Sequence, residues 1–140
     1  MILLDTSVLS ELIKPVPNEH VAAWLNTLSA HDVSTTSITA AELWAGVRRL
    51  PDGRRKAKLA TEIDGVLYED LGGRIEAFDL SAANQYGSIS AVRARQGNPI
   101  GVADAQIAAI CASRSATLAT RNVKDFVDTG IKLINPWEQR

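Results

Sequence analysis

The chain has 140 residues, of which 46% are hydrophobic and 22% are charged, as expected for one soluble globular domain that spans residues 1–140. Its net charge of −1 excludes a general attraction to nucleic acid, so contact with RNA or DNA must be local, metal-mediated or supplied by a partner. The single cysteine, Cys111, excludes an internal disulfide and favours a reducing compartment, which indicates the cytoplasm. No apolar run approaches the roughly 18–20 residues that a membrane span needs, so we expect no membrane contact.

Short apolar segments alternate along the chain with segments whose apolar residues have helical spacing. The short segments predict strands at residues 2–4, 33–35, 74–78, 117–120 and 131–134. Helices are predicted up to about residue 14, after the cap Asn18, at 39–50, after Asp52, from Ser81 to about residue 97, around Ile107 and Ile110, and at 122–127. This alternation predicts an α/β fold, with a central parallel sheet of about five strands and helices on both faces.

Asp5 directly follows the first predicted strand, where Thr6 and Ser7 precede a helical pattern. In open α/β sheets, ligands bind beyond the carboxyl ends of the strands, so this carboxylate stands where chemistry usually occurs. A simpler interpretation is that Asp5 only caps the helix that follows. The motif by itself leaves both roles open.

Asp104 lies in a predicted helix on the face that should be buried. The residues three, four and seven positions later are Ile107, Ala108 and Cys111, so the acid belongs to the apolar stripe. A carboxylate on such a stripe destabilises the fold unless something pairs with it. Its place in the first turn would complement the helix dipole, but this does not explain the apolar face. We therefore favour a functional role for Asp104.

Glu42 follows Thr39 at the Thr-x-x-Glu spacing of a capping box, which predicts that these two residues begin a helix together. The residues three and four positions after Glu42 are Ala45 and Gly46, whose small size leaves open space beside the acid. That space suits a ligand or a second carboxylate. The two roles are compatible, because capping and metal binding can use different oxygens.

A further polar group follows the strand predicted at residues 117–120, again on the ligand side of the sheet. Asn122 is a natural cap for the short helix that follows, and Asp125 either completes that cap or faces a ligand.

Other acid-dependent sites do not fit the sequence. Haloacid-type phosphatases carry a second aspartate two residues after the first, and Asp5 has none; a glycine-rich phosphate loop and a Gly-x-Ser-x-Gly motif are also absent. His20, His31 and Cys111 are too few and too scattered for a zinc site. Hard oxygen ligands at strand ends remain, and these favour Mg²⁺ or Mn²⁺.

Five motifs follow one another along the chain: Ile2-Leu-Leu-Asp5-Thr-Ser, Ile38-Thr-Ala-Ala-Glu42-Leu, Ile100-Gly-Val-Ala-Asp104-Ala-Gln-Ile-Ala-Ala, Leu118-Ala-Thr-Arg-Asn122-Val-Lys-Asp125-Phe and Asn135-Pro-Trp137. In their order and spacing the chain resembles the PIN-domain family, specifically the VapC/FitB branch of bacterial toxin ribonucleases. The resemblance covers the whole chain. It implies a PIN-like fold with Asp5, Glu42 and Asp104 as metal-binding acids. The fourth family acid falls at Asn122, an amide here, so Asp125 is a candidate to replace it.

The resemblance also implies an activity, namely hydrolysis of RNA phosphodiesters by the toxin of a toxin–antitoxin pair with Mg²⁺ or Mn²⁺ as cofactor. Asp5 and Asp104 would hold the ion, and Glu42 would orient the attacking water. Three further residues are candidates to contact the acids or the phosphate: Thr6, Thr120 and Arg93.

The implied partners are an RNA substrate and a VapB/FitA-like antitoxin, with DNA reached only through the antitoxin. We also expect a homodimer, because Trp24, Trp44 and several aliphatic helix faces exceed what one small core needs. A basic cluster near Pro51 could follow an RNA backbone, but a solvated surface is the simpler interpretation. Its members are Arg48, Arg49, Arg54, Arg55, Lys56 and Lys58.

An alternative function belongs to a different class. The chain could be a weakly active or inactive PIN module that binds a DNA-binding antitoxin and co-regulates transcription with it. The amide at Asn122 is the feature that favours this alternative, and a metal-dependent cleavage assay separates the two.

Overall fold

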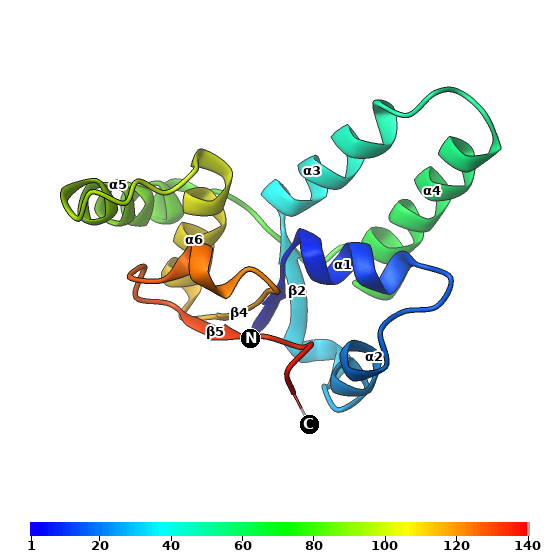
Figure 1. Cartoon of the computed structure of the whole chain (residues 1–140), viewed down its shortest axis with the longest axis horizontal. Coiled ribbons are helices and arrows are strands. Elements are labelled where there is room, and N and C mark those ends of the chain that lie inside the picture. The colour runs from blue at the N-terminus through cyan, green and yellow to red at the C-terminus, as the bar shows by residue number, and fades with distance from the viewer. Residues whose placement is uncertain (140) are drawn as a thin grey trace.

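The computed structural model describes residues 1–139 and contains a five-stranded sheet in which all neighbouring strands are parallel (Figure 1). The strand order is β3-β2-β1-β4-β5. The strands are β1 (Ile2–Leu4), β2 (Val33–Thr36), β3 (Ile75–Glu76), β4 (Thr117–Ala119) and β5 (Lys132–Ile134). The predicted sheet is confirmed, although the edge strand β3 is shorter than predicted because only the last two residues of β2 pair with it.

The helices occupy the segments that the apolar spacing predicts. They are α1 (Thr6–Ile13), α2 (Glu19–Asn26), α3 (Ser37–Arg48), α4 (Arg54–Asp64), α5 (Leu80–Arg95) and α6 (Val102–Arg114). Shorter helical turns are η1 (Ala30–Asp32), η2 (Gly65–Asp70), which continues α4 as a π-helix, and η3 (Val123–Phe126). Within residues 1–139, no helix is both long and apolar enough to cross a membrane.

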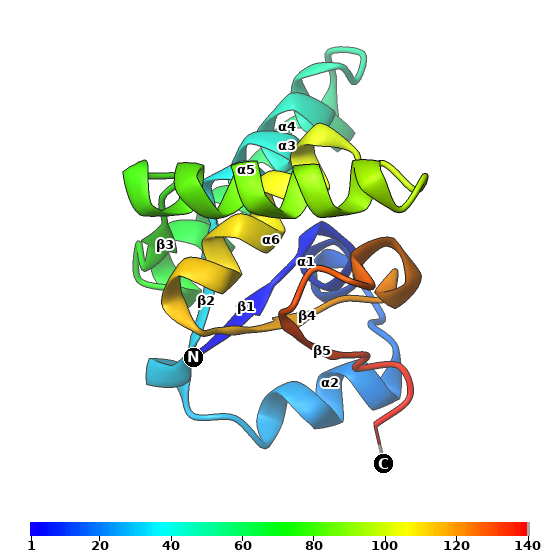
Figure 2. The ribbon, with the colours of Figure 1, turned by 90° about the vertical axis from the view of Figure 1, so that its left-hand side faces the viewer.

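The sheet separates two hydrophobic cores, as the alternation of side chains along β1 requires. Leu3 points into a core formed with α5 and α6, whereas Leu4 points into a second core formed with α1, α2, α3, α4 and η2. In Figure 2, α5 and α6 lie on one side of the sheet and α2 lies on the other. In Figure 1, α3 and α4 form a hairpin that projects from the sheet. The helices therefore cover both faces and leave the carboxyl ends of the central strands between two groups of helices.

The start of α3 differs from the prediction and changes the environment of Glu42. The hydroxyl of Thr36 accepts a hydrogen bond from the backbone amide of Thr39 at 3.0 Å, so Thr36 is the cap. The predicted capping box of Thr39 with Glu42 is wrong, because β2 runs directly into the helix and Thr36 already has the extended backbone of a cap. Glu42 thus lies in the second turn, and its carboxylate accepts a bond from another helix.

Two more helices begin at residues that differ from the prediction. α4 follows Gly53 instead of Asp52, whose 98% exposed side chain pairs with Lys56 at 3.0 Å. α5 follows Asp79 instead of Ser81, and the Asp79 carboxylate accepts a backbone hydrogen bond at 3.0 Å. In both places several good capping residues stand close together, so the local pattern does not decide among them.

Candidate functional site

The carboxyl ends of β1 and β4 bring Asp5 and Thr120 together at one edge of the sheet. The two strands pair with Leu4 opposite Ala119, so the residues that follow them fall at the same level. The amide of Asp5 donates to the carbonyl of Ala119 at 3.1 Å, which extends the pairing one residue beyond β1. This register places side by side two residues that are 115 positions apart in the sequence.

Asp5 is buried, with 6% of its surface exposed, and both carboxylate oxygens accept hydrogen bonds. Oδ1 accepts from the hydroxyl of Ser7 and from the backbone amide of Val8, and Oδ2 accepts from the hydroxyl of Thr120. The bond from Val8 confirms that Asp5 caps α1. Burial raises the pKa of Asp5, and the hydroxyl and amide donors oppose that effect only in part. The carboxylate is therefore held in one orientation in a weakly solvated place.

Glu42 reaches the same region from α3. Its side chain is exposed, and Oε1 accepts a hydrogen bond from the hydroxyl of Thr6, the first residue of α1, at 3.1 Å. Glu42, Thr6 and Gly46 line a hollow of about 380 Å³ between α1, α3 and α4. A Cβ added at Gly46 would meet no atom within 4 Å, as the predicted open space requires. The candidate role of Thr6 as a partner of an acid thus agrees with the structure.

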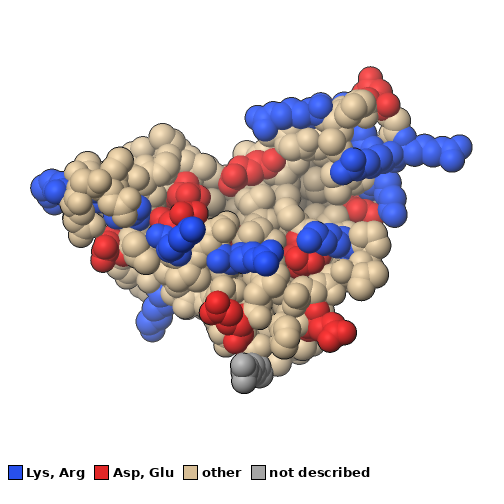
Figure 3. Space-filling view, viewed as in Figure 1, with Lys and Arg blue, Asp and Glu red and all other residues tan. Residues whose placement is uncertain are grey.

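Asp104 lies in the first turn of α6 and is half-buried. Burial raises its pKa most, and the negative charges of Asp125, Glu42 and Asp5 raise it further, whereas the charge of Arg93 lowers it. The charges of three acids from other elements therefore all act on Asp104. In Figure 3, acidic side chains lie on both sides of the notch between the α3–α4 hairpin and the α5–α6 pair.

The segment after β4 supplies the remaining predicted residues. The hydroxyl of Thr120 accepts a hydrogen bond from the backbone amide of Asn122 at 3.0 Å while it donates to Asp5. Asn122 precedes η3 at the cap position, as predicted, but its exposed side chain makes no capping hydrogen bond to this turn. Asp125 is also exposed, and its charge is the largest one acting on Asp104.

Two residues have roles that the sequence did not reveal. Ser7 connects two segments, because its hydroxyl donates to Asp5 and accepts from the backbone amide of Arg121 at 3.2 Å. Arg93, the candidate phosphate contact, is 3% exposed and donates to three backbone carbonyls instead. The Asp-x-Ser spacing is a signal that could have identified Ser7, whereas the enclosure of Arg93 depends on contacts with a distant segment.

The donor chemistry of this edge fits a hard divalent cation. Carboxylate oxygens are the ligands that Mg²⁺ and Mn²⁺ prefer, and a cation would offset the mutual repulsion that raises the pKa of Asp104. In the part of the chain that the structure describes, no three acidic, histidine or cysteine side chains already converge closely enough to surround one ion. Shared coordination of one ion would therefore require the side chains of these acids to turn toward a common point.

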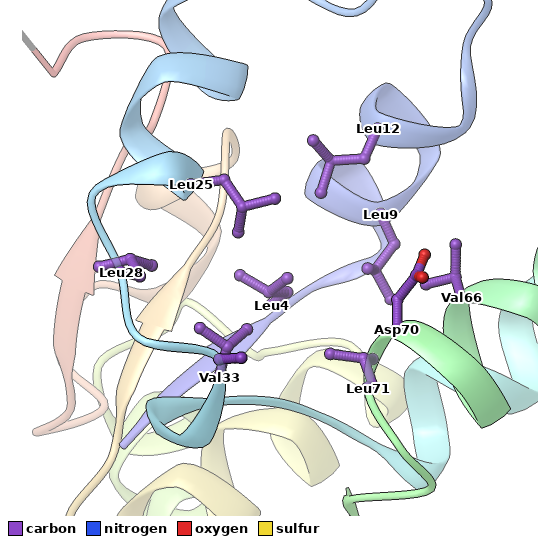
Figure 4. A pocket seen from close by; sticks show the side chains of 10 residues that line it. Leu4, Leu9, Leu12, Leu25, Leu28, Val33, Val66, Asp70 and Leu71 are labelled. Carbon is purple, nitrogen blue, oxygen red and sulfur yellow. The ribbon is translucent and has the colours of Figure 1, made fainter.

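A mostly apolar pocket lies elsewhere. It has a volume of about 360 Å³ and lies between β1, β2, α1, α2 and η2, where Asp70 is its one charged lining residue (Figure 4). The side chains around it are aliphatic: Leu4, Leu9, Leu12, Leu25, Leu28, Ala30, Val33, Val66 and Leu71. This pocket lacks the group of polar side chains that catalysis or metal binding needs. The acids at the sheet edge therefore remain the candidate site.

Comparison with known proteins gives one consistent result. The PIN domain family matches residues 2–132. The chain is 40% identical over 137 residues to the toxin FitB of Neisseria gonorrhoeae, covering 98% of this chain and 99% of the relative. It is 37% identical over 138 residues to the VapC ribonuclease Y4jK of Sinorhizobium fredii, covering 99% of each chain.

A solved structure shows the same arrangement. The structure of FitAB bound to an IR36 DNA fragment superposes with a TM-score of 0.91 at 38% identity, over 100% of this chain and 98% of that chain. The TM-score shows that the two chains share one fold. The chain therefore belongs to the PIN-domain family, in its VapC/FitB branch.

Proposed function

We propose that this protein is a Mg²⁺- or Mn²⁺-dependent endoribonuclease that acts as the toxin of a toxin–antitoxin pair. The observation that carries the proposal is the gathering of Asp5, Glu42 and Asp104 from three separate elements at one edge of the sheet, where their charges raise the pKa of Asp104. Like charges are placed together at a cost in stability, which favours a site that binds a cation. A relative named as a ribonuclease supports RNA as the substrate.

The three acids have different tasks in this proposal. Asp5, which Ser7 and Thr120 hold in one orientation, and Asp104 would hold the ion. Glu42 accepts a proton or a hydrogen bond from the attacking water and orients it toward the phosphorus. When bound, a divalent ion would lower the pKa of a water molecule attached to it and would offset negative charge on the phosphate. Thr6 fixes the carboxylate of Glu42 through a hydrogen bond of 3.1 Å.

The fourth position distinguishes this chain from the family pattern. Asn122 offers a neutral oxygen where the family has an acid, and divalent ions lose affinity as the charge of their ligands falls. We therefore expect one ion held by Asp5 and Asp104, and a second position that fills only at high ion concentration or with RNA present. Asp125 contributes its charge to that second position.

The partners follow from the relatives. The structure of FitAB bound to DNA supports a VapB/FitA-like antitoxin as the partner of this chain and contact with DNA through that antitoxin. We also propose a homodimer. Trp24 is buried in the core and gives this proposal no support, so the proposal rests on Trp44, which is only half-buried. Light scattering at high concentration should give twice the mass of 15.1 kDa, and a monomer under those conditions would reject the dimer.

A second candidate function rests on Asn122. A neutral residue at the fourth position favours a PIN module with little or no catalysis, which binds a DNA-binding antitoxin and co-regulates transcription with it. In this case the purified chain would bind the antitoxin but would not cleave RNA in the presence of Mn²⁺.

A cleavage assay on the purified protein tests the leading proposal. Wild-type protein should cleave RNA with Mg²⁺ or Mn²⁺ but not with EDTA, and Asp5→Asn should remove the activity while the fold is retained. Asp52→Asn makes the same charge change at a fully exposed turn and should keep full activity. Full activity of Asp5→Asn, or equal cleavage in EDTA, would contradict the proposal.

A further inference from the structure

A buried arginine joins two segments that carry acids. Arg93 lies near the C-terminal end of α5 and has 3% of its surface exposed. Its Nε donates to the carbonyl of Asn98 at 2.8 Å, and its Nη1 donates to the carbonyls of Asp125 and Val127 at 3.1 and 2.9 Å. One guanidinium thus satisfies backbone carbonyls from the α5–α6 loop and from the end of η3.

These two segments are the ones that position two acids of the site. Asn98 belongs to the loop that leads into α6, whose first turn contains Asp104. Asp125 lies within η3, and Val127 follows this turn. A buried guanidinium destabilises the fold when its donors lose their partners, so displacement of either segment would leave at least one donor of Arg93 unsatisfied. The arginine therefore resists relative movement of the two segments.

We propose that Arg93 is a positioning residue, which fixes the η3 segment against the start of α6 and so sets the separation of Asp104 and Asp125 for cation binding. The proposal rests on the metal site proposed above. The Nε and Nη1 donors of Arg93 are directed at backbone carbonyls, so in this proposal Arg93 acts through these segments and not as a ligand of the ion.

The charge and the hydrogen bonds of Arg93 have opposite effects on cation binding, and this allows a decisive test. The positive charge of Arg93 acts on Asp104 and disfavours a second cation nearby. Removal of the charge alone would therefore tighten Mn²⁺ binding. Loss of the three hydrogen bonds would loosen the segment that carries Asp125 and would weaken Mn²⁺ binding. The sign of the change identifies which effect dominates.

The experiment measures Mn²⁺ affinity by titration calorimetry for wild type, Arg93→Met and Arg93→Lys. Both variants should bind Mn²⁺ about tenfold more weakly, as expected when a group that supports metal ligands is lost. Lysine keeps the charge but cannot reach three carbonyls from one planar group. Tighter or unchanged binding in Arg93→Met, or wild-type affinity in Arg93→Lys, would overturn the positioning role. If the methionine variant does not fold, the lysine variant provides the same test.

Arg114→Met is the matched control. Arg114 lies at the C-terminal end of α6, far from Asp104 in the first turn of this helix. It is mostly buried and donates to the carbonyl of Ala77 at 2.8 Å. Its removal should lower stability in a similar way but leave Mn²⁺ affinity unchanged. A tenfold loss of affinity in this control would show that general destabilisation is sufficient and would reject the specific role of Arg93.

Hydrogen exchange of the metal-free protein gives an independent readout. Amides of residues 123–129 should exchange faster in Arg93→Met than in wild type, and Arg114→Met should leave them unchanged. Equal exchange in wild type and Arg93→Met would overturn the proposal. Asp104→Asn distinguishes failure of the metal site from failure of the positioning role. Wild-type Mn²⁺ affinity in Asp104→Asn would contradict the metal site itself. A loss of affinity in Asp104→Asn without a loss in Arg93→Met would contradict only the role of Arg93.

Discussion

The two ends of α6 place charged residues in opposite environments. At the C-terminal end, Arg114 forms ion pairs with Glu76 at 3.1 Å and with Asp79 at 3.2 Å. At the N-terminal end, Asp104 lies among acids that repel it. The two groups are about 15 Å apart along the helix, given a rise of 1.5 Å per residue.

The pKa shifts have opposite signs at the two ends. A hydrogen bond from the backbone amide of Ala82, together with the charge of Arg114, lowers the pKa of Asp79. Burial and the neighbouring acids raise the pKa of Asp104. Paired charges at the C-terminal end support folding, whereas unpaired like charges at the N-terminal end oppose it. Such a local cost is typical of a site that binds a ligand.

The largest expected effect is a loss of activity at the acidic end. Glu42→Gln keeps the volume of the side chain but removes its charge, so it should lower the rate of RNA cleavage about 100-fold, as is typical when a positioned general base is lost. Single-turnover cleavage with saturating Mn²⁺ measures this change. Asp52→Asn is the control and should cleave at the wild-type rate; a Glu42→Gln rate within twofold of wild type would remove Glu42 from the site.

A smaller effect concerns the affinity for the cation. Asn122→Asp adds a negative charge at the fourth position and should tighten Mn²⁺ binding about tenfold. Asp125→Asn should weaken binding less than Asp5→Asn does, and Asp128→Asn, a change in the same segment, should have no effect. Titration calorimetry compares the four variants. Unchanged affinity in Asn122→Asp would mean that this side chain does not face the ion.

At the paired end, the expected effect is on stability alone. Arg114→Met removes both ion pairs and a backbone hydrogen bond, so the Tm should fall by about 3–5 °C. Thermal unfolding followed by circular dichroism measures the change. Cleavage of RNA below the Tm should be the same as in wild type. A loss of activity there would contradict the assignment of the C-terminal end of α6 to stability alone.

The smallest effect has the opposite sign. Asp104→Asn removes a repelled charge, so the Tm of the metal-free protein should rise by about 2–3 °C at pH 7. The folded-state pKa of Asp104 lies above its ordinary value of 3.8, so the penalty exists above the folded pKa and is lost as the pH falls through it. The difference in Tm between wild type and Asp104→Asn should therefore shrink in acid. A difference that grows in acid would contradict the sign of the shift.

Most of the fold could be predicted because its signals are local. Apolar triplets such as Ile2–Leu4 and helical spacing around Ile107 mark buried strands and helix faces without knowledge of their neighbours. The starts of α3 and α5 were predicted at the wrong residues, since Thr36 and Thr39, or Asp79 and Ser81, compete within a few positions. In the structure the cap hydrogen bonds come from Thr36 and Asp79.

The candidate site could be predicted in part, for a related physical reason. Asp5 and Asp104 stand out because each is an acid at a strand end or on an apolar stripe. The bond from Thr120 to Asp5 was only one of two possible roles for this hydroxyl, since it depends on how β1 and β4 align across 115 positions. Arg93 lies on a helix with many polar residues, and its enclosure depends on the α5–α6 loop and on the distant η3 segment.

The central claim is that Asp5 and Asp104 belong to one cation site, and a double-mutant cycle tests it most directly. Mn²⁺ affinity is measured by titration calorimetry for wild type, Asp5→Asn, Asp104→Asn and the double variant. Ligands of one site should be non-additive: each single variant should lose at least about tenfold in affinity, and the double variant should lose much less than the product of the two. Losses that multiply, or single variants that bind as wild type does, would contradict a shared site.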